Sequence, residues 1–290
     1  MRHHYISPLR YPGGKAALAP FFAELMDAQT PRPHTYVEPF AGGGGAALRS
    51  LYEEYVDRIV LNDLNPGIAA FWRAVFWNTD ELIGLIASCE LSIDAWHTYR
   101  EQYTSPLSSD LELGFATLYL NRTNRSGILD ARPIGGLRQT GKWKIGARFN
   151  REGLIERVRI LGSYRNRVEV LQSDALDMLK ATDTKRVFFY IDPPYLTQGD
   201  DLYMNTLSWN DHEKLSRILM DRHNHWVLTY DVDPRVPNML YQDLRCAEFS
   251  IKHTAAVQQM GNEYAVFSPR LRVESIGRLS RGYAEWLSSS

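Results

Sequence analysis

The stretch TYVEPFAGGGG, residues 35–45, joins an apolar run to four consecutive glycines. Such a run, followed by an apolar helical pattern, predicts a strand, a sharp turn and a helix. Glycine has no Cβ, so a ligand can approach the helix N-terminus closely. The turn alone does not identify the ligand. Gly42, Gly44 and Ala47 loosely satisfy the dinucleotide fingerprint, and a glycine turn without a ligand is a third interpretation.

Strand and helix patterns alternate on both sides of this stretch. Further apolar runs that suit buried strands cover residues 58–62, 168–171, 187–191 and 226–230. Helical patterns cover residues 15–26, 44–55, 66–77, 174–180 and 211–220. The alternation predicts an α/β fold with a doubly wound, mostly parallel sheet, whose ligands lie beyond the carboxyl ends of the strands.

Two details of the second half are also expected. Asn210 and Glu213 have the spacing of a capping box, which predicts that the helix at 211–220 begins there. The runs at 247–253 and 263–267 predict an antiparallel hairpin that closes the sheet edge.

Residues 80–165 break the alternation with helical patterns at 94–103 and 111–120 and a loop rich in Gly, Arg and Lys. We therefore expect an inserted, mainly helical lobe there. The catalytic, cofactor-binding domain is then 1–79 with 166–270, and 271–290 is a tail of unreadable function.

Charge is uneven along the chain. Residues 121–170 contain twelve Lys or Arg and four Asp or Glu, so this window carries +8 and the remainder −9. A solvated helical face would give the same count, but a basic lobe on an acidic scaffold also predicts a surface that faces DNA.

Composition sets the class of protein. With 44% hydrophobic and 23% charged residues, the 290-residue chain is expected to fold as a globular protein. It has no 18-residue apolar run and no apolar leader, so we expect neither a membrane span nor secretion. Cys89 and Cys246 suggest neither a disulfide framework nor a metal site, and they fit a reducing cytoplasm.

A carboxylate follows the second predicted strand. Asp63 lies 21 residues after Gly42, where it can accept hydrogen bonds from both ribose hydroxyls. The pair therefore indicates a ligand that contains a nucleoside.

The motif Asp192-Pro193-Pro194-Tyr195 follows the apolar run 187–191 directly. Each proline keeps the residue before it extended, so one side-chain and one or two backbone acceptors form a fixed fork. Two acceptors on the hydrogens of an aromatic amine favour a pyramidal, more nucleophilic nitrogen. Tyr195 can stack on a base taken out of the duplex. A rigid turn after a strand is the structural alternative.

These motifs together resemble the Dam-like family of DNA adenine methyltransferases. The resemblance rests on LRYPGGK at 9–15, EPFAGGG at 38–44, LNDLN at 61–65, SD at 173–174 and DPPY at 192–195. It implies S-adenosylmethionine as the cofactor, with Asp63 on its ribose and Asp174 on its adenine amine. The implied cofactor-binding residues are Tyr11, Lys15, Glu38, Phe40, Ala41, Gly42, Gly43, Gly44, Asp63, Asp174 and Asp192. Asp192, Pro193, Pro194 and Tyr195 are the implied catalytic residues.

Double-stranded DNA is the implied partner, and a cognate restriction endonuclease is a further candidate. Residues 121–127, NRTNRSG, resemble the family segment that leads into a Gly-rich DNA-binding loop. In Lys142-Trp143-Lys144, two cations flank an aromatic residue, a pattern that suits phosphates and bases. The expected DNA contacts are Arg122, Asn124, Arg125, Arg138, Lys142, Trp143 and Lys144.

The predicted activity is direct methyl transfer to the exocyclic amine of a flipped adenine, without a metal. Cytosine carries an exocyclic amine too, but Asp rather than Ser at position 192 favours adenine. No suitable Cys lies beside a proline, which argues against ring-carbon methylation. A dinucleotide-dependent oxidoreductase and a non-catalytic DNA-binding relative are the remaining alternatives.

Overall fold

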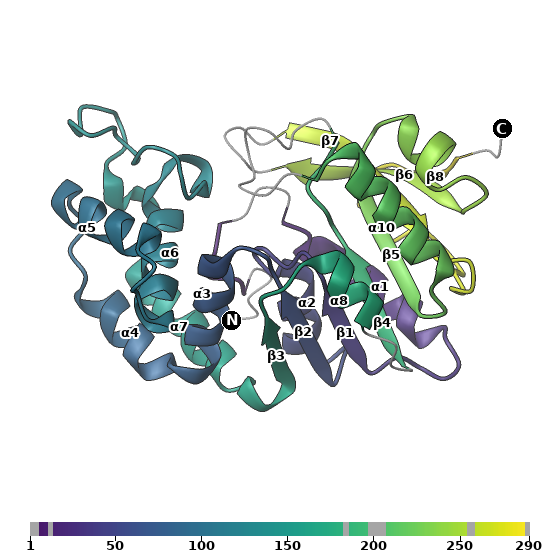
Figure 1. Cartoon of the computed structure of the whole chain (residues 1–290), viewed down its shortest axis with the longest axis horizontal. Coiled ribbons are helices and arrows are strands. Elements are labelled where there is room, and N and C mark those ends of the chain that lie inside the picture. The colour runs from purple at the N-terminus through teal and green to yellow at the C-terminus, as the bar shows by residue number, and fades with distance from the viewer. Residues whose placement is uncertain (1–5, 11–13, 182–185, 197–206, 254–258, 288–290) are drawn as a thin grey trace.

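The computed structural model describes residues 6–10, 14–181, 186–196, 207–253 and 259–287. Within these ranges, eight strands form one sheet in the order β3-β2-β1-β4-β5-β7-β6-β8 (Figure 1). The strands are β1 (Thr35–Glu38), β2 (Arg58–Asn62), β3 (Val168–Leu171), β4 (Val187–Ile191), β5 (His225–Asp231), β6 (Cys246–His253), β7 (Gln259–Phe267) and β8 (Ala284–Trp286).

The sheet is parallel from β3 to β5 and antiparallel beyond it. β1 pairs with β2 on one side and with β4 on the other, so the strand order reverses between β1 and β4. Ligands of such sheets bind beyond the carboxyl ends at the reversal. The residues there are Glu38, which ends β1, and Asp192, which follows β4.

Helices cover both faces of the sheet. Phe188 and Tyr190 of β4 share one apolar cluster with Phe22 of α1 (Ala19–Asp27), and α2 (Gly45–Tyr52) packs into the same cluster. Phe189 points to the opposite face, where Leu215 of α10 (Trp209–Asp221) and α8 (Ala175–Ala181) pack. Successive strand residues face opposite sides, so an unbroken apolar strand requires a helical layer on each. The doubly wound prediction is confirmed.

The predicted lobe is helical and lies to one side of the sheet (Figure 1). α3 (Pro66–Trp77) leads into α4 (Thr79–Ser88), α5 (Ile93–Thr104), α6 (Asp110–Thr123) and α7 (Arg151–Gly162). α6 crosses α3 so closely that a Cβ on Gly114 would lie 2.7 Å from the carbonyl oxygen of Ala70. Phe115 and Leu154 of the lobe belong to the same apolar cluster as Phe188 of the sheet. The lobe therefore shares its core with the sheet.

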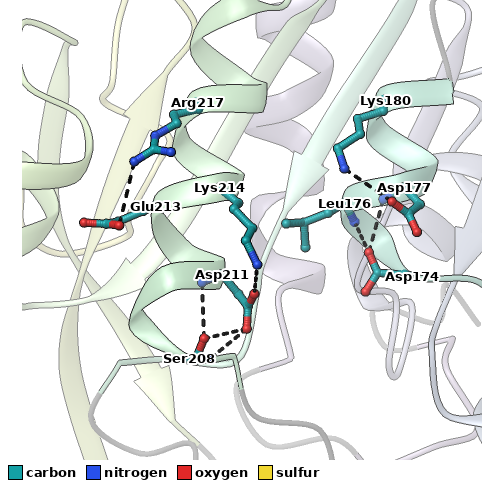
Figure 2. A network of polar contacts seen from close by, with 9 residues as sticks. All are labelled: Asp174, Leu176, Asp177, Lys180, Ser208, Asp211, Glu213, Lys214 and Arg217. Carbon is teal, nitrogen blue, oxygen red and sulfur yellow. Dashed lines mark hydrogen bonds and ion pairs between the residues drawn. The ribbon is translucent and has the colours of Figure 1, made fainter.

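Two sequence expectations need correction. The hairpin of β6 and β7 exists, but it does not close the sheet, because β8 pairs with β6 outside it. The capping box of α10 is formed by Ser208 and Asp211 instead of Asn210 and Glu213 (Figure 2). The backbone of Ser208 is extended, so its hydroxyl can accept a hydrogen bond from the amide of Asp211. Asn210 is already inside the helix.

Residues 271–287 are part of the fold. Leu271, Ile276 and Leu279 are buried, and β8 extends the sheet. In the described ranges, no helix combines the length and the apolar character that crossing a membrane requires. Cys89 and Cys246 are buried free thiols.

Candidate active site

Asp192 lies where the fold predicts a ligand, directly after β4. Its side chain is 24% exposed, so it remains reachable from outside. Thr229 of β5 donates to Oδ1 at 2.8 Å, and Lys15 lies 3.0 Å from Oδ2. Pro193 and Pro194, which follow, carry no N–H that could compete for these oxygens. The carboxylate is thus oriented by two other chain segments, β5 and the residue before the first helical turn.

Lys15 connects this carboxylate to the rest of the site. It precedes the first helical turn and is 4% exposed, and its Nζ lies 2.7 Å from the hydroxyl of Tyr195. A Cβ on Gly45, at the start of α2, would lie 3.6 Å from the amide nitrogen of Lys15. The backbone of Lys15 therefore lies beside the start of α2, and its side chain contacts the DPPY motif. Its contact with a cofactor stays a prediction.

Glu263 of β7 is a member of the site that the sequence patterns did not predict. It is 1% exposed, and its Oε1 lies 3.3 Å from Lys15 Nζ and 2.9 Å from the Tyr195 hydroxyl. Burial raises the pKa of Glu263 to about 7; Lys15 opposes this rise and Asp192 adds to it. The only signal in the sequence is one acid inside an apolar strand, EYAVF.

Tyr195 is held by its hydroxyl. The hydroxyl lies 3.0 Å from Asp192 Oδ1. The ring of Tyr195 is half-buried, and its centroid lies 6.3 Å from that of the Tyr230 ring. Stacking of Tyr195 on a target base stays a prediction.

The glycine turn after β1 needs glycine at two places. Gly42 and Gly44 have φ of +46° and +57°, which residues with a Cβ adopt only with strain. Trp72 of α3 donates to the carbonyl of Gly42 at 2.9 Å, and Ser7 donates to that of Gly43 at 2.6 Å. The turn is therefore fixed from both sides.

Glu38 links the turn to the helix that follows. Gly44, the N-cap of α2, has no side chain, and the buried Glu38 accepts from the amide of Ala47 instead, at 2.8 Å. Burial, with a contribution from the Asp192 charge, raises the pKa of Glu38 to about 8. Ala41 is buried, and the ring of Phe40 is half-buried beside the turn. Direct cofactor contacts of these residues stay predictions.

Asp63 has free acceptor sites of the kind to which ribose hydroxyls can donate. Its Oδ2 accepts from the amide of Gly42 at 2.8 Å and its Oδ1 from that of Asn65 at 2.9 Å. Each carboxylate oxygen has about two lone-pair sites, so each can accept one more hydrogen bond. Burial raises the pKa of Asp63 to about 6, and two hydroxyl donors would stabilise its charge.

Asp174 caps α8. Its Oδ1 accepts from the amides of Leu176 and Asp177, at 2.9 and 3.1 Å (Figure 2). The side chain is exposed, so a ligand amine can approach the second oxygen. Together with Asp63 and the glycine turn, these acceptors fit S-adenosylmethionine. Tyr11, also expected at the cofactor, lies outside the described residues.

Comparison with known families agrees with this geometry. The sequence profile of the D12 class N6 adenine-specific DNA methyltransferases matches residues 11–260. The chain belongs to this family. S-adenosylmethionine is accordingly the cofactor expected for this member of the D12 class.

Three named relatives are similar at low identity. The modification methylase StsI of Streptococcus sanguinis is 25% identical over 72% of this chain and 30% of its own length. The DNA adenine methylase of Haemophilus influenzae is 28% identical over 41% of each chain. The type II methyltransferase M.MjaIII of Methanocaldococcus jannaschii is 22% identical over 64% of this chain and 68% of its own. The match thus spans less than half of the first two relatives.

In this D12 methyltransferase, the residues expected at DNA divide into exposed and buried ones. Arg125, Arg138 and Lys142 are exposed, as is Lys144, and Trp143 is 62% exposed, so its indole does not pack into the lobe. The ammonium of Lys142 lies 5.7 Å from the centroid of the Trp143 ring. These five residues present cations and one aromatic face to solvent.

Asn124 has a different position. It is fully buried, accepts from the Trp96 indole at 2.7 Å and donates to the carbonyls of Ile128 and Leu129. This side chain therefore holds the 125–129 turn against α5. Its amide is turned into the lobe, away from the surface on which the exposed residues lie.

Arg122 belongs to a cluster of arginines beside the N-terminal segment. Arg122 donates to the carbonyl of Pro8 at 2.7 Å, and Arg157 donates to that of Ser7 at 3.2 Å. Burial, with the charges of Arg157 and Arg10, lowers the pKa of Arg122 to about 9. Because these cations repel one another, an anion such as a DNA phosphate would stabilise the cluster.

Proposed function

We propose that this chain transfers a methyl group from S-adenosylmethionine to the exocyclic amine of adenine in double-stranded DNA. The observation that carries the proposal is the reachable Asp192 carboxylate, fixed after β4 and beside the glycine turn that follows β1. An aromatic amine is a weak nucleophile, because its lone pair is delocalised. An acceptor on its N–H draws the lone pair back toward nitrogen.

The cofactor supplies an electrophilic methyl group on a sulfonium sulfur and leaves as a neutral thioether. Asp63 is proposed to hold its ribose, Asp174 its adenine amine and the Gly42–Gly44 turn its methionine part. The target nitrogen releases one proton as it gains the methyl group, and Asp192 is proposed to receive that proton. The rate gain would come from positioning and from this polarisation.

The adenine must leave the duplex to reach Asp192. We propose that the lobe holds the duplex through Arg125, Arg138, Lys142, Trp143 and Lys144, with the Arg122 cluster nearer the site. Their exposed charges supply phosphate contacts. A DNA substrate and the buried free thiols support a location in the cytoplasm. One relative is named a modification methylase and another a type II methyltransferase, so a cognate endonuclease belongs to the proposal.

Analysis of the modified nucleoside tests the proposal. Unmethylated genomic DNA is incubated with the protein and S-adenosylmethionine, digested and separated by mass spectrometry. N6-methyladenine is expected. N4-methylcytosine would establish the cytosine alternative, and no methylated base would support a non-catalytic relative. Long-read sequencing of the same DNA would give the recognition sequence.

A further inference from the structure

The site contains a second carboxylate, Glu263, to which the proposed chemistry gives no role. Its strand is paired on both sides, since Glu263 faces Asp231 of β5 and Phe249 of β6 in the register. The backbone is therefore fixed, and the side chain is 1% exposed. A buried carboxylate is costly unless its partners compensate, so its contacts bear on its role.

Asp192 and Glu263 share the same two donors. The Tyr195 hydroxyl lies 3.0 Å from Asp192 Oδ1 and 2.9 Å from Glu263 Oε1. The Lys15 ammonium lies 3.0 Å from Asp192 Oδ2 and 3.3 Å from Glu263 Oε1. A tyrosine hydroxyl has one proton and can donate it to one carboxylate at a time. A small rotation of the Tyr195 hydroxyl therefore decides which carboxylate accepts its hydrogen bond.

Asp192 is crowded as the structure stands. Its Oδ1 lies within 2.8 Å of the Thr229 hydroxyl, 3.0 Å of the Tyr195 hydroxyl and 3.2 Å of the Lys15 ammonium. An oxygen with about two lone-pair sites cannot serve these donors and a target amine equally. Each donor also draws charge from the carboxylate and weakens it as an acceptor. In the described part of the chain Oδ2 has one donor, Lys15, so it is at Oδ1 that a donor has to leave before the amine can bind fully.

We propose that Glu263 is a positioning residue that takes Lys15 and Tyr195 over from Asp192 when the target amine arrives. This inference rests on the proposed function. No covalent bond changes: the Tyr195 proton turns from one carboxylate oxygen to another, and the Lys15 ammonium moves along its flexible stem. Thr229 also bonds the buried Tyr190 hydroxyl at 2.8 Å, so it stays and keeps Asp192 oriented.

The charge of Glu263 matters for this role. The groups that face it are Lys15, Asp192 and Tyr195, with Tyr190 from β4 and Asp231, its register partner on β5. Only the ionised form holds the ammonium as an ion pair and accepts strongly from the tyrosine. Because the pKa of Glu263 is raised to about 7, the rate of methyl transfer should rise as pH increases through about 7.

The decisive comparison uses single-turnover methyl transfer by the wild type, Glu263→Gln and the matched control Glu248→Gln. Glu248 lies on β6, where it accepts from Asn262 outside the site. We expect Glu263→Gln to lower the rate constant about 10- to 100-fold, as removal of a charged hydrogen bond does. The substitution should also abolish the rise in rate near pH 7. The affinity for S-adenosylmethionine, measured by calorimetry, should be unchanged, and the Glu248→Gln control should have the wild-type rate. A rate within about twofold of the wild type, with the same pH profile, would overturn the proposal.

Two further measurements separate this inference from the proposed function. In a Lys15→Met background, Glu263→Gln should have a much smaller effect on the rate, because the donor to be transferred is gone. The carboxyl carbon of Glu263 can also be titrated by nuclear magnetic resonance without any substrate. Its pKa should fall in Asp192→Asn and rise in Lys15→Met.

A pKa that stays the same in both variants would show that the carboxylates do not share donors. A wild type that methylates no base, with both pKa changes present, would instead make the proposed function wrong. Glu263→Gln conserves the shape of the side chain, so the variant is expected to fold. The pH profile of the wild type tests the proposal without any substitution.

Discussion

At the scale of single residues, the site separates two carboxylates by their surroundings. Asp192 accepts hydrogen bonds from side chains, whereas Asp63 accepts them from backbone amides. A group held by flexible side chains can exchange them for a substrate. A group held by backbone amides keeps its partners and adds new donors. We therefore expect substitutions at the two positions to affect different measured quantities.

Asp192→Asn should lower methyl transfer by at least about 100-fold, because the amide is neutral and accepts the target N–H weakly. Affinity for S-adenosylmethionine should change little, since Asp63 and Asp174 are proposed to carry it. Tritium transfer and calorimetry measure the two quantities. Asp177→Asn, an exposed carboxylate on α8, is the control and should match the wild type. Near-normal turnover of Asp192→Asn would remove the polarisation argument.

Asp63→Asn should weaken cofactor binding about 10- to 100-fold, because charged acceptors form the stronger hydrogen bonds. The wild-type affinity should also depend on pH. Burial raises the pKa of Asp63 to about 6, and the ionised form is the one that accepts both hydroxyls. Affinity should therefore fall as pH drops below about 6. Calorimetry between pH 5 and 8 measures this affinity, and a wild-type affinity that is constant over that range would refute the prediction.

At the scale of elements, the start of α10 gives a stability test. Ser208→Ala should lower the free energy of unfolding by about 1 kcal/mol, because the amide of Asp211 loses its acceptor. Asn210→Ala is the matched control. It lies exposed inside the helix and should change stability by less than about 0.5 kcal/mol. Urea unfolding measures the free energy of unfolding of both variants. A larger decrease for Asn210→Ala than for Ser208→Ala would show that Asn210 is the N-cap, as the sequence pattern predicts.

The elements that could be predicted are those with strong local patterns. β1, β2, β3 and β4 have the expected bounds, because each is a short apolar run followed by polar or turn residues. α4 and α7 could not be predicted individually, since their apolar residues pack mainly against each other and against α3. β8 could not be predicted either, because a three-residue edge strand carries almost no pattern of its own.

The candidate site divides in the same way. Asp63 and Asp192 could be found because each follows a predicted strand. Glu263 could not, because the sheet brings it to Lys15 across most of the chain. Asn124 shows the opposite problem: its amide suits DNA in the sequence, yet it is buried inside the lobe.

At the scale of the whole molecule, the uneven charge predicts how DNA binding depends on salt. Replacing Lys142 and Lys144 together by Ala should weaken binding to all duplexes alike. It should also reduce the slope of log affinity against log salt by up to about 0.9 for each phosphate that these lysines neutralise in the wild type. Lys180 and Lys214, exposed on α8 and α10, provide a control pair. Fluorescence anisotropy at several salt concentrations decides, and an unchanged slope in the lobe variant would place the DNA surface elsewhere.

The three-residue strand β8 has a consequence for how these molecules behave toward one another. It pairs with Ala247, Glu248 and Phe249 and so covers part of the outer edge of β6, an eight-residue strand, where the amides and carbonyls would otherwise face solvent. Exposed strand edges template pairing between chains. A chain cut before Gly282 should therefore self-associate at micromolar concentration, which light scattering after size-exclusion chromatography would detect. The last few residues of the sheet would then act as a guard against aggregation.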